Sequence, residues 1–499
     1  MPMSLFQTIQ VTLSKKMSAK MNIVLSVLIA LSAIWSCGGG SKVNPTPADT
    51  RSLTLGRESV ELPYQKTEFS ISVTANFEYS VSVEGDWIHE NTSSSTEFMR
   101  VFTADENPSA GGRSAEIKFT DKKDRYYSKS VSVSQAANPV SNVTLHIVDK
   151  NATEETKALF ANLWKIADTG WMFGHHDDLW YGRYWYDEAG NSDTKAVCGD
   201  YPAVFSVDFA EIMDDRHNSS ANAIRRRVIL EARERGEVIL ACAHLNNPKT
   251  GGDSWDNSSN EVVKEILREG TETRKKYLSW LDRCADFANN LYDSRGKLIP
   301  VIFRPYHEHT QSWSWWGASC TTESDFIALW QFTVKYLRDT KGVHNFLYSV
   351  SPQMDAVYSN AKERILFRWP GDEWVDFIGM DCYHGTNDSA FAANLKAIEE
   401  VSLDKKKPCG VTEDGKESFT ETDFWTRHVL SPLAERRISL VTMWRNKYVG
   451  NNESDKHYFS VYPGHPSEEN FRTMYADPKS LFSKDLPNMY TIPAGYVIK

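Results

Sequence analysis

The stretch 299–317, IPVIFRPYHEHTQSWSWWG, decides how the rest of the chain is interpreted. It begins with apolar, mostly β-branched residues, which predict a buried strand. Arg304, His307 and Glu308 follow at the end of that strand. A carboxylate with a cation and an imidazole beside it, at the C-terminal end of a parallel strand, is the usual layout of an active site in an α/β barrel. The alternative interpretation is a structural Arg–Glu pair that caps a strand.

Tryptophans follow this strand end at short spacing. Trp313, Trp315 and Trp316 predict a mostly aromatic wall beside Glu308. Flat aromatic faces suit the apolar C–H faces of sugar rings, and carboxylates suit glycosidic acid and base chemistry. The alternative is that these tryptophans belong to the core. Together the carboxylate and the aromatic residues indicate a carbohydrate-active site.

The composition restricts the class of protein. A length of 499 residues predicts two or three domains. Charged residues at 24% and hydrophobic residues at 41% are typical of a soluble globular protein. The formal net charge of −10 argues against nucleic acid as a partner. An aromatic content of 12% fits a surface that handles carbohydrate. We expect a monomer.

The first 37 residues predict a targeting segment. Three lysines precede an apolar run at 23–35, which is too short to be a convincing membrane-spanning helix. The run ends in Ser36-Cys37-Gly38-Gly39, which resembles a bacterial lipobox in which Cys37 is lipidated. Residues 38–51 are rich in Gly, Pro, Ser and Thr and predict a flexible linker. We therefore expect an outer-membrane lipoprotein, at the cell surface or the periplasmic face. The alternative is a cleaved signal peptide with an incidental cysteine.

Residues 52–137 predict a small all-β, immunoglobulin-like sandwich. Short runs with period-two alternation recur at 69–73, 79–83, 115–119 and 130–134. Asp86-Trp87-Ile88 and the turn 107–112 resemble the BACON module of polysaccharide-degrading proteins from Bacteroidetes. That name implies sugar binding, but the segment has no evident ladder of exposed aromatic residues. We expect Trp87 in the core and a spacer role for the module.

Residues 142–499 alternate between apolar strand patterns and helical patterns. This alternation predicts an α/β fold, a (β/α)₈ TIM barrel. An open doubly wound sheet would carry a glycine-rich phosphate turn after its first strand, and none is present. The predicted strands are 172–175, 203–208, 238–244, 300–305, 346–350, 377–383, 410–413 and 440–444. The predicted helices include 221–235, with a solvated charged face, and 260–290, 323–339, 388–401 and 421–436.

Polar residues stand at the ends of most predicted strands. The ends of parallel barrel strands meet at one mouth, so these side chains are expected to share a site. They are His175, Asp208, His244, Arg304, His307, Glu308, Asp381, Tyr383, Glu413, Trp444 and Arg445. For some residues a structural interpretation competes. Asp381 is expected to be a buried structural carboxylate. For Asp208 the structural and the functional interpretation carry equal weight. Asp414 and Glu417 are expected to be solvated loop charges. Trp255 is either a lid residue or a surface residue.

Five motifs in this order closely resemble glycoside hydrolase family 26, chiefly β-mannanases. They are FGHHDD, FRPYHEHTQSWSWW, WPGDEWVDFIGMDCY, GVTEDG and TMWR, and the resemblance covers roughly residues 145 to 495. It implies that Glu308 is the general acid/base and Glu413 the nucleophile. His307 stands where most of the wider clan has Asn, and a histidine at this position is typical of this family. The chain departs from the family pattern in FGHH, where FGHQ is commoner, and in the run 309–311.

The remaining site residues receive roles from the same layout. A retaining glycosidase places its two carboxyl groups about 5–5.5 Å apart. Tyr383 and Arg304 are candidates to keep Glu413 charged, and His307 is expected near the sugar 2-hydroxyl. Trp444 is expected under the sugar next to the nucleophile, and Trp313 on the leaving-group side. The further substrate-binding candidates are Arg445, His244 and His175.

The expected function is retaining hydrolysis of β-1,4-mannosidic linkages in mannan, galactomannan or glucomannan, whether polysaccharide or oligosaccharide. One alternative is another β-glycan, a β-1,3/1,4-glucan or a β-xylan, cleaved by the same glutamate pair. The other is a non-catalytic, glycan-binding lipoprotein. The expected membrane contact is the lipid on Cys37. No Cys/His cluster has zinc spacing, and the chemistry requires neither a cofactor nor a metal. Cys242 and Cys382 are expected as buried, free thiols in barrel strands.

Overall fold

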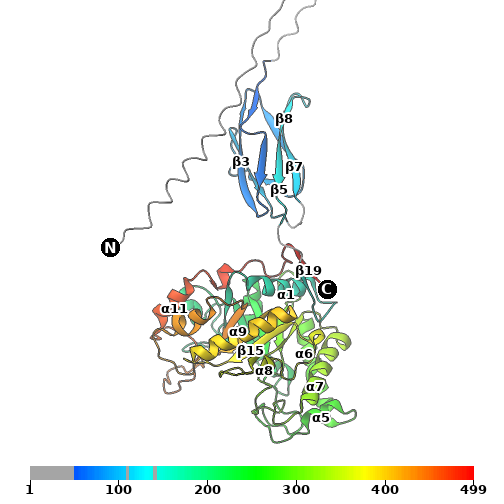
Figure 1. The fold of residues 1–499 in the computed structure, drawn as a ribbon, viewed down its shortest axis with the longest axis vertical. Helices are drawn as coiled ribbons and strands as arrows, with labels where there is room; N and C mark the ends of the chain where they lie inside the picture. Colours follow the sequence, from blue (N-terminus) through cyan, green and yellow to red (C-terminus); the bar gives the residue numbers. More distant parts are fainter. Residues whose placement is uncertain (1–49, 108–111, 139–142) are drawn as a thin grey trace, which may run out of the picture.

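The computed structural model describes residues 50–107, 112–138 and 143–499 (Figure 1). The predicted signal peptide, Cys37 and most of the predicted linker therefore lie outside the described residues. Within the described ranges, no helix combines the length and the apolar character that crossing a membrane requires.

The first part of the chain forms two four-stranded sheets. One has the order β1-β3-β6-β5 and the other β2-β8-β7-β4. The strands are β1 Leu53–Leu55, β2 Ser59–Leu62, β3 Thr67–Ala75, β4 Tyr79–Val83, β5 Ile88–Glu90, β6 Met99–Ala104, β7 Arg113–Asp121 and β8 Ser128–Gln135. All pairs are antiparallel except β2 with β8, which is parallel. The four alternating sequence runs lie in β3, β4, β7 and β8.

One apolar cluster fills the space between these sheets. Inward residues of the alternating strands, such as Ile71, Phe102 and Val131, have no exposed surface. Trp87 lies in this cluster, as predicted, with the Arg113 guanidinium 4.3 Å from the centre of its ring. Burying each such side chain contributes roughly 1.5–3 kcal/mol. The sandwich therefore has a core of its own.

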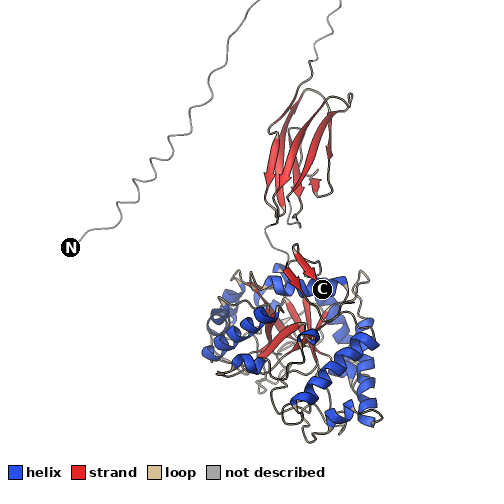
Figure 2. Ribbon diagram, turned by 45° about the vertical axis from the view of Figure 1, so that its right-hand side comes forward, coloured by secondary structure: helices blue, strands red, loops and turns tan. Residues whose placement is uncertain are grey.

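The second part is a closed parallel barrel (Figure 2). Its strands are β10 Trp171–His176, β11 Val204–Asp208, β12 Val238–Cys242, β13 Val301–Arg304, β14 Phe346–Val350, β15 Phe377–Cys382, β16 Cys409–Asp414 and β17 Leu440–Met443. Consecutive strands pair in parallel, and β10 pairs with both β11 and β17, which closes the sheet. Each predicted strand corresponds to one of these, so the predicted (β/α)₈ barrel is confirmed.

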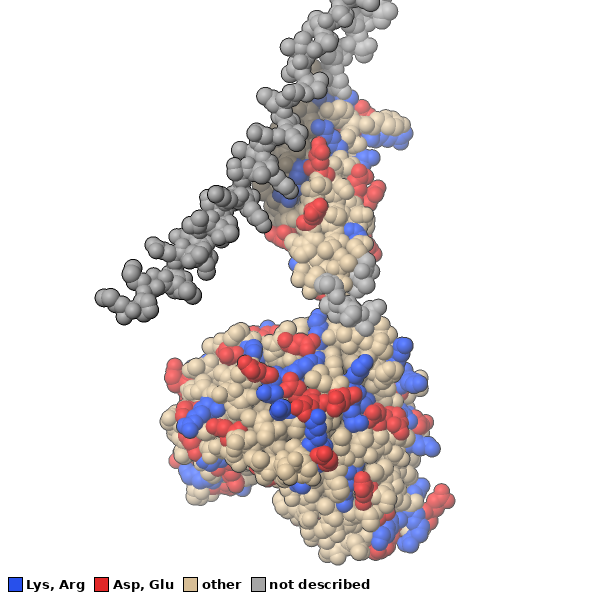
Figure 3. All heavy atoms as spheres, viewed as in Figure 1, with Lys and Arg blue, Asp and Glu red and all other residues tan. Residues whose placement is uncertain are grey.

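Helices surround the barrel. They are α1 Glu154–Ile166, α2 Asp193–Cys198, α3 Ala210–Met213, α4 Ala221–Glu234, α5 Val262–Leu267, α6 Glu272–Asn289, α7 Glu323–Lys335, α8 Ala361–Ile365, α9 Asp388–Lys405, α10 Ser431–Leu433 and α11 Glu468–Tyr475. Short strands accompany them: β9 Val143–Leu145 pairs with β19 Tyr496–Ile498, and β18 Ser480–Leu481 adds to β10. Figure 3 shows acidic and basic side chains intermixed over the visible face of the barrel.

Some helix predictions are wrong in detail. The predicted helix 260–290 is two helices, because Gly270 takes a left-handed backbone with φ +82° and Thr271 caps α6 by accepting the Arg274 N–H at 3.1 Å. The predicted helix 421–436 is a π-helical segment, Trp425–Leu430, followed by α10. The charged face of α4 is not wholly solvated, because Arg225 and Arg233 are buried against Trp180 and Tyr490.

One apolar layer closes the barrel opposite its mouth. It is built from residues near the N-terminal ends of the strands together with the apolar face of α1. Members from the strands include Met172, Val204, Ile302, Leu347 and Leu440, all without exposed surface. Bulky aliphatic side chains in such a layer make the interior a packed core and not a pore. This packing fixes the strands, and therefore the positions of the residues at their opposite ends.

We predict that Leu347→Ala lowers the free energy of unfolding by about 2–5 kcal/mol, because it opens a cavity in this layer. Leu403→Ala is the matched control, since Leu403 on α9 is 47% exposed. The control should stay within about 0.5 kcal/mol of the parent protein. Urea unfolding followed by tryptophan fluorescence measures both, and equal effects of the two substitutions would contradict the assignment of this layer.

Candidate active site

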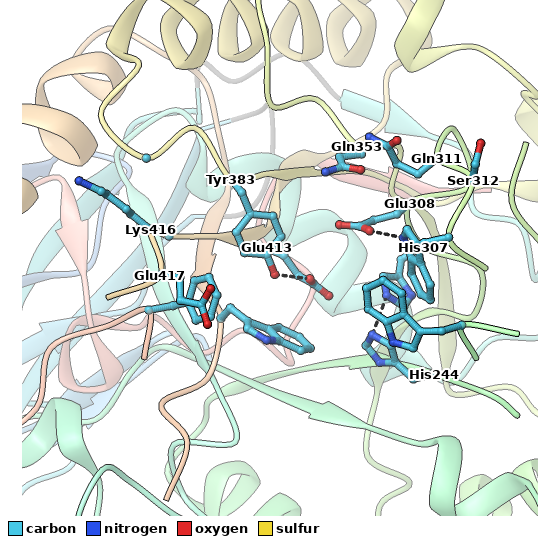
Figure 4. Close-up of a pocket in the computed structure, with 16 residues that line it drawn as sticks. His244, His307, Glu308, Gln311, Ser312, Gln353, Tyr383, Glu413, Lys416 and Glu417 are labelled. Atoms are coloured by element: carbon cyan, nitrogen blue, oxygen red, sulfur yellow. Dashed lines mark hydrogen bonds between the residues drawn. The ribbon is translucent and has the colours of Figure 1, made fainter. Parts of the chain in front are cut away.

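A cavity of about 720 Å³ opens at the C-terminal ends of the barrel strands (Figure 4). Its lining comprises His244, Trp255, His307, Glu308, Gln311, Ser312, Trp313, Gln353, Tyr383, Gly385, Glu413, Gly415, Lys416, Glu417, Trp444 and Phe459. Most of the predicted site residues are therefore brought together in one cavity. Arg304, Arg445 and His175 were also predicted, and they do not contribute to the lining.

Glu308 and Glu413 face each other across this cavity (Figure 4). Glu308 follows β13 and Glu413 lies in β16. Three carboxylate oxygens, one each from Glu308, Glu413 and Asp381, lie within 4.8 Å of one another. Carboxyl groups about 5–5.5 Å apart leave no room for an intervening water, whereas an acid and a base that activate water stand about 6.5–9.5 Å apart. This pair is placed for direct attack by one carboxylate and protonation by the other.

Arg304 holds Glu413 from below the cavity floor. Its Nη1 donates to the Asp381 Oδ2 at 2.9 Å, and its Nη2 donates to the Glu413 Oε1. The Tyr383 hydroxyl donates to the other oxygen of Glu413 at 2.6 Å. Both oxygens of Glu413 are thus hydrogen-bonded, and one of them to a cation, which favours its charged form. Asp381 is fully buried and also accepts from the Thr412 hydroxyl at 2.7 Å, which agrees with the structural role expected of it.

Glu308 has a different environment. Burial, and then the nearby charge of Glu413, raise the pKa of the Glu308 carboxyl to about 7. The Trp313 indole N–H, which donates to its Oε2, opposes that rise. The backbone of Glu308 is left-handed, with φ +51°, and its N–H donates to the Ser351 carbonyl at 2.6 Å. Such a conformation costs a non-glycine residue about 1–3 kcal/mol and is characteristic of functional sites.

A chain of hydrogen bonds supports the histidines. The Nε2 atoms of His307 and His244 lie 3.0 Å apart, and the His244 Nδ1 lies 3.0 Å from the Asp208 Oδ2. Burial opposes the charged form of His244, but the Asp208 carboxylate raises its pKa. Burial, and then the His244 charge, lower the pKa of His307. These opposite pKa directions favour His244 as the charged partner and donor, and His307 as the neutral partner and acceptor. Asp208, left open by the sequence, acts through His244.

The aromatic wall is smaller than predicted. Trp313 lines the cavity, but Trp315 and Trp316 are fully buried, and their indole N–H groups donate to the carbonyls of Leu245 at 3.0 Å and His307 at 2.8 Å. The prediction was wrong for these two, which hold the loop in place. Trp255 completes the wall instead, because it is 64% exposed and its ring centre lies 4.6 Å from that of Trp313.

Other predicted residues lie outside the lining. His175 is buried, with its Nδ1 3.3 Å from the Thr194 hydroxyl and 3.1 Å from Asp178. Its neighbour His176 points the other way, as successive strand residues do, and stacks on Trp444 at 4.2 Å. The Arg445 Nη1 lies 3.4 Å from the Tyr181 hydroxyl, beside the cavity.

The expectation for Asp414 was wrong. It is not solvated: it is fully buried, and it lies 2.9 Å from the His384 Nδ1. Glu417 is exposed, as expected, but it lines the cavity and lies 2.7 Å from the His457 Nδ1.

Several lining residues were not predicted. Gln353 follows β14, Gln311 belongs to the loop after β13, and Lys416 and Phe459 come from the loops after β16 and β17. Gln353 and Lys416 are the two that the strand-end rule would have found, since they lie three residues beyond Val350 and two beyond Asp414. The others depend on how long loops fold back, and the strand pattern carries no signal for that.

Two groups of side chains in the described residues have metal-binding geometry. One group is the three carboxylates of Glu308, Asp381 and Glu413. The other is Asp208, Cys242 and His244, whose ligand atoms also lie within 4.8 Å of one another. In each group hydrogen bonds already use some of these atoms: Arg304 donates to Asp381 and Glu413, and Asp208 bonds to His244. Cys242 and Cys382 are free and buried, as expected.

Comparison with known proteins places this site among glycosidases. A family model described as glycosyl hydrolase family 26 matches residues 148–421, more than half of the chain, including both glutamates. A mannan endo-1,4-β-mannosidase of Bifidobacterium adolescentis is 32% identical over 388 residues, covering 70% of this chain and 37% of that protein. One from Bacillus subtilis is 26% identical over 303 residues, covering 56% of this chain and 76% of that protein.

A solved structure shows the same likeness. The structure of a GH26 β-mannanase from Bacteroides ovatus is 38% identical, with a TM-score of 0.63, and covers 68% of this chain and 98% of that chain. The coverage of the relatives differs widely. This chain spans little more than a third of the length of the bifidobacterial protein.

We predict that Glu413→Gln lowers the pKa of Glu308 from about 7, because the charged form of Glu308 is no longer repelled by a neighbouring carboxylate. The pKa of Glu308 should remain above the ordinary value of about 4.3, because the burial of its carboxyl is unchanged. Carbon-13 NMR of the labelled carboxyl measures the titration. Glu435→Gln, at an exposed position remote from the cavity, is the control. An unchanged Glu308 titration in Glu413→Gln would contradict the coupling.

Proposed function

The chain belongs to glycosyl hydrolase family 26, and from this we propose that it is an endo-acting, retaining β-1,4-mannanase. Its substrates would be mannan, galactomannan or glucomannan. One observation carries the proposal: Glu308 and Glu413 present carboxylate oxygens within 4.8 Å of each other at the mouth of the barrel. The two glutamates have different surroundings, and two roles require such a difference.

The surroundings assign the roles. Glu413 is held charged by Arg304 and Tyr383, so it attacks the anomeric carbon and forms a glycosyl ester. Glu308, with its pKa raised to about 7, gives its proton to the departing glycosidic oxygen. Esterification removes the charge of Glu413, so the pKa of Glu308 falls. Glu308 then takes a proton from the water that attacks the ester, and the sugar leaves with its original configuration while Glu413 is freed.

The walls of the cavity suit a chain of sugars. The Trp313 indole bonds to Glu308, so the Trp313–Trp255 pair lies on the side of the leaving group. His307 and His244 supply polar contacts near the reacting sugar, and Trp444 supplies an apolar surface. Mannan as the substrate is supported by the names of the relatives, which include mannan endo-1,4-β-mannosidases from two bacterial genera.

We predict that Glu413→Ala reduces turnover of β-mannan by at least about a thousandfold, because it removes the attacking carboxylate. The wild type should release oligosaccharides from β-mannan and much less from cellulose or xylan, as product sizing would show. Glu435→Ala is the control for substitution of a glutamate. Near-normal activity of correctly folded Glu413→Ala would refute the nucleophile, and a preference for xylan or cellulose would refute the substrate.

We also propose that the protein is a monomeric lipoprotein of the outer membrane, anchored through Cys37. The support is the apolar run at 23–35, which ends two residues before this cysteine. The sandwich, with its own core and the residue pattern of a BACON-type module, would act as a spacer between anchor and barrel.

The anchor predicts a specific effect of Cys37→Ser. Lipid labelling of the bacterial cells should mark the wild type and not the variant, and the variant should fractionate as a soluble protein. Its turnover of soluble oligosaccharides should be unchanged, because the whole sandwich lies between residue 37 and the barrel in the sequence. A wild type that is already soluble and unlabelled would contradict the anchor.

A further inference from the structure

Exposed tyrosines gather beside the cavity, on the loops that follow β10 and β17. Tyr186 is 46% exposed and Tyr448 is 43% exposed. Tyr181 is partly buried and packs against the barrel core. We call Tyr181, Tyr186 and Tyr448 the tyrosine platform. None of them lines the catalytic cavity, and the mechanism derived above does not use them.

A continuous line of contacts joins the platform to the cavity. Trp444 lines the cavity, and the Nη1 of the next residue, Arg445, lies 3.4 Å from the Tyr181 hydroxyl. The ring of Tyr181 lies 6.3 Å from that of Tyr186, with 12° between their planes. The ring of Tyr186 lies 5.6 Å from that of Tyr448. The platform therefore adjoins the cavity on the side of Trp444.

The backbone puts two of the rings on one face. Tyr181 and Tyr186 form an antiparallel bridge, and side chains directly opposite each other across such a bridge project to the same side. The Gly182 N–H donates to the Trp185 carbonyl at 3.1 Å and completes this short hairpin. The near-parallel rings therefore follow from the backbone and are not an accident of side-chain rotation.

Buried hydrogen bonds tie the two loops together. The Asp193 Oδ2 accepts from the Arg183 N–H at 2.8 Å and from the Asn446 side chain at 3.0 Å, so one carboxylate joins both loops. The Val449 N–H donates to the Arg183 carbonyl at 3.1 Å, next to Tyr448. A surface held in this way loses little conformational entropy when it binds.

The chemistry of the platform suits a neutral polysaccharide. Rings with half of their surface in water offer apolar faces for sugar C–H groups and hydroxyls for hydrogen bonds. The ion pair of Arg227 with Asp187 lies at the edge of the platform, and these side chains are 34% and 42% exposed. The alternative is that the tyrosines pack only on each other. That arrangement would not require two of the three rings to stay this exposed beside the mouth of a binding cavity.

Given the proposed function, on which this inference rests, we propose that the tyrosine platform is a distal binding surface for the non-reducing part of a β-mannan chain. The side of the chain follows from Glu308. Trp313 and Trp255 stand beside this acid and receive the leaving group, whereas the platform lies beyond Trp444, past Arg445. Long substrates therefore gain contacts that short ones cannot reach.

The test compares Tyr186→Ala, Tyr448→Ala and the double variant on linear β-1,4-manno-oligosaccharides of increasing length. Loss of each aromatic face should lower kcat/KM on long oligosaccharides about three- to tenfold, mainly through KM. The shortest oligosaccharide that the wild type cleaves should be unaffected. Tyr184→Ala is the matched control, because Tyr184 is 43% exposed in the same loop but its ring faces Tyr462.

Two results would overturn the proposal. One is an equal loss at every chain length, which indicates a structural effect on the loop, and the other is no loss on the longest substrates. Failure of the proposed function gives a different result, because the wild type would then cleave another β-glycan. The wild type and the tyrosine variants are in that case compared on oligomers of that glycan. If no glycan is cleaved, calorimetric Kd values for manno-oligosaccharides of two lengths decide. Unchanged values in the double variant would refute the platform.

Discussion

The buried guanidinium of Arg304 is the interaction on which the rest of the site depends. It has no exposed surface, and it bonds to Asp381 on β15 and to Glu413 on β16 from its own place at the end of β13. Without it, two carboxylates would lie together in a region of low dielectric, which costs several kcal/mol for each unpaired charge. The triad forms only because the closed barrel brings β13, β15 and β16 to one mouth. The apolar layer at the other end of the barrel therefore has a catalytic consequence.

The charge that Arg304 preserves on Glu413 also sets the state of Glu308. Burial and this charge raise the pKa of Glu308 to about 7, and in the proposed mechanism the loss of the charge on esterification reverses the effect of the charge. The same side chain can therefore act as acid in the first step and as base in the second. The left-handed backbone of Glu308 indicates that the surrounding loop imposes its position, and the indole hydrogen bonds of Trp315 and Trp316 hold that loop.

The sequence predicts the barrel and the two facing glutamates because both depend on strong, local signals. Buried strands appear as apolar runs, and polar residues at their ends stand out. The direction of each side chain is harder, since one residue reverses it, as His175 and His176 illustrate. Between β15 and β16 the register shifts after Met380, and between β16 and β17 it shifts before Asp414. Such irregularities turn Glu413 into the cavity and Asp414 into the core, and no alternation pattern reveals them.

The loops are the part that the sequence could not predict. Trp255 and the tyrosine platform lie on loops, and the two loops of the platform are held together by hydrogen bonds such as those of Asp193. The tryptophans near residue 315 illustrate the same limit, because composition marks them as aromatic but does not say which of them face a ligand. A polar or aromatic residue in a loop gives no periodic signal from which its direction follows.

The stereochemistry of the first-formed product tests the central claim most directly. Proton NMR of the reducing-end anomer, recorded within the first minutes of hydrolysis of a β-manno-oligosaccharide, distinguishes the two outcomes. Direct attack by Glu413 predicts that the β-anomer appears first and the α-anomer only later, by mutarotation. If the α-anomer appears first, water and not Glu413 attacks the sugar, and the assignment of Glu413 as nucleophile is wrong.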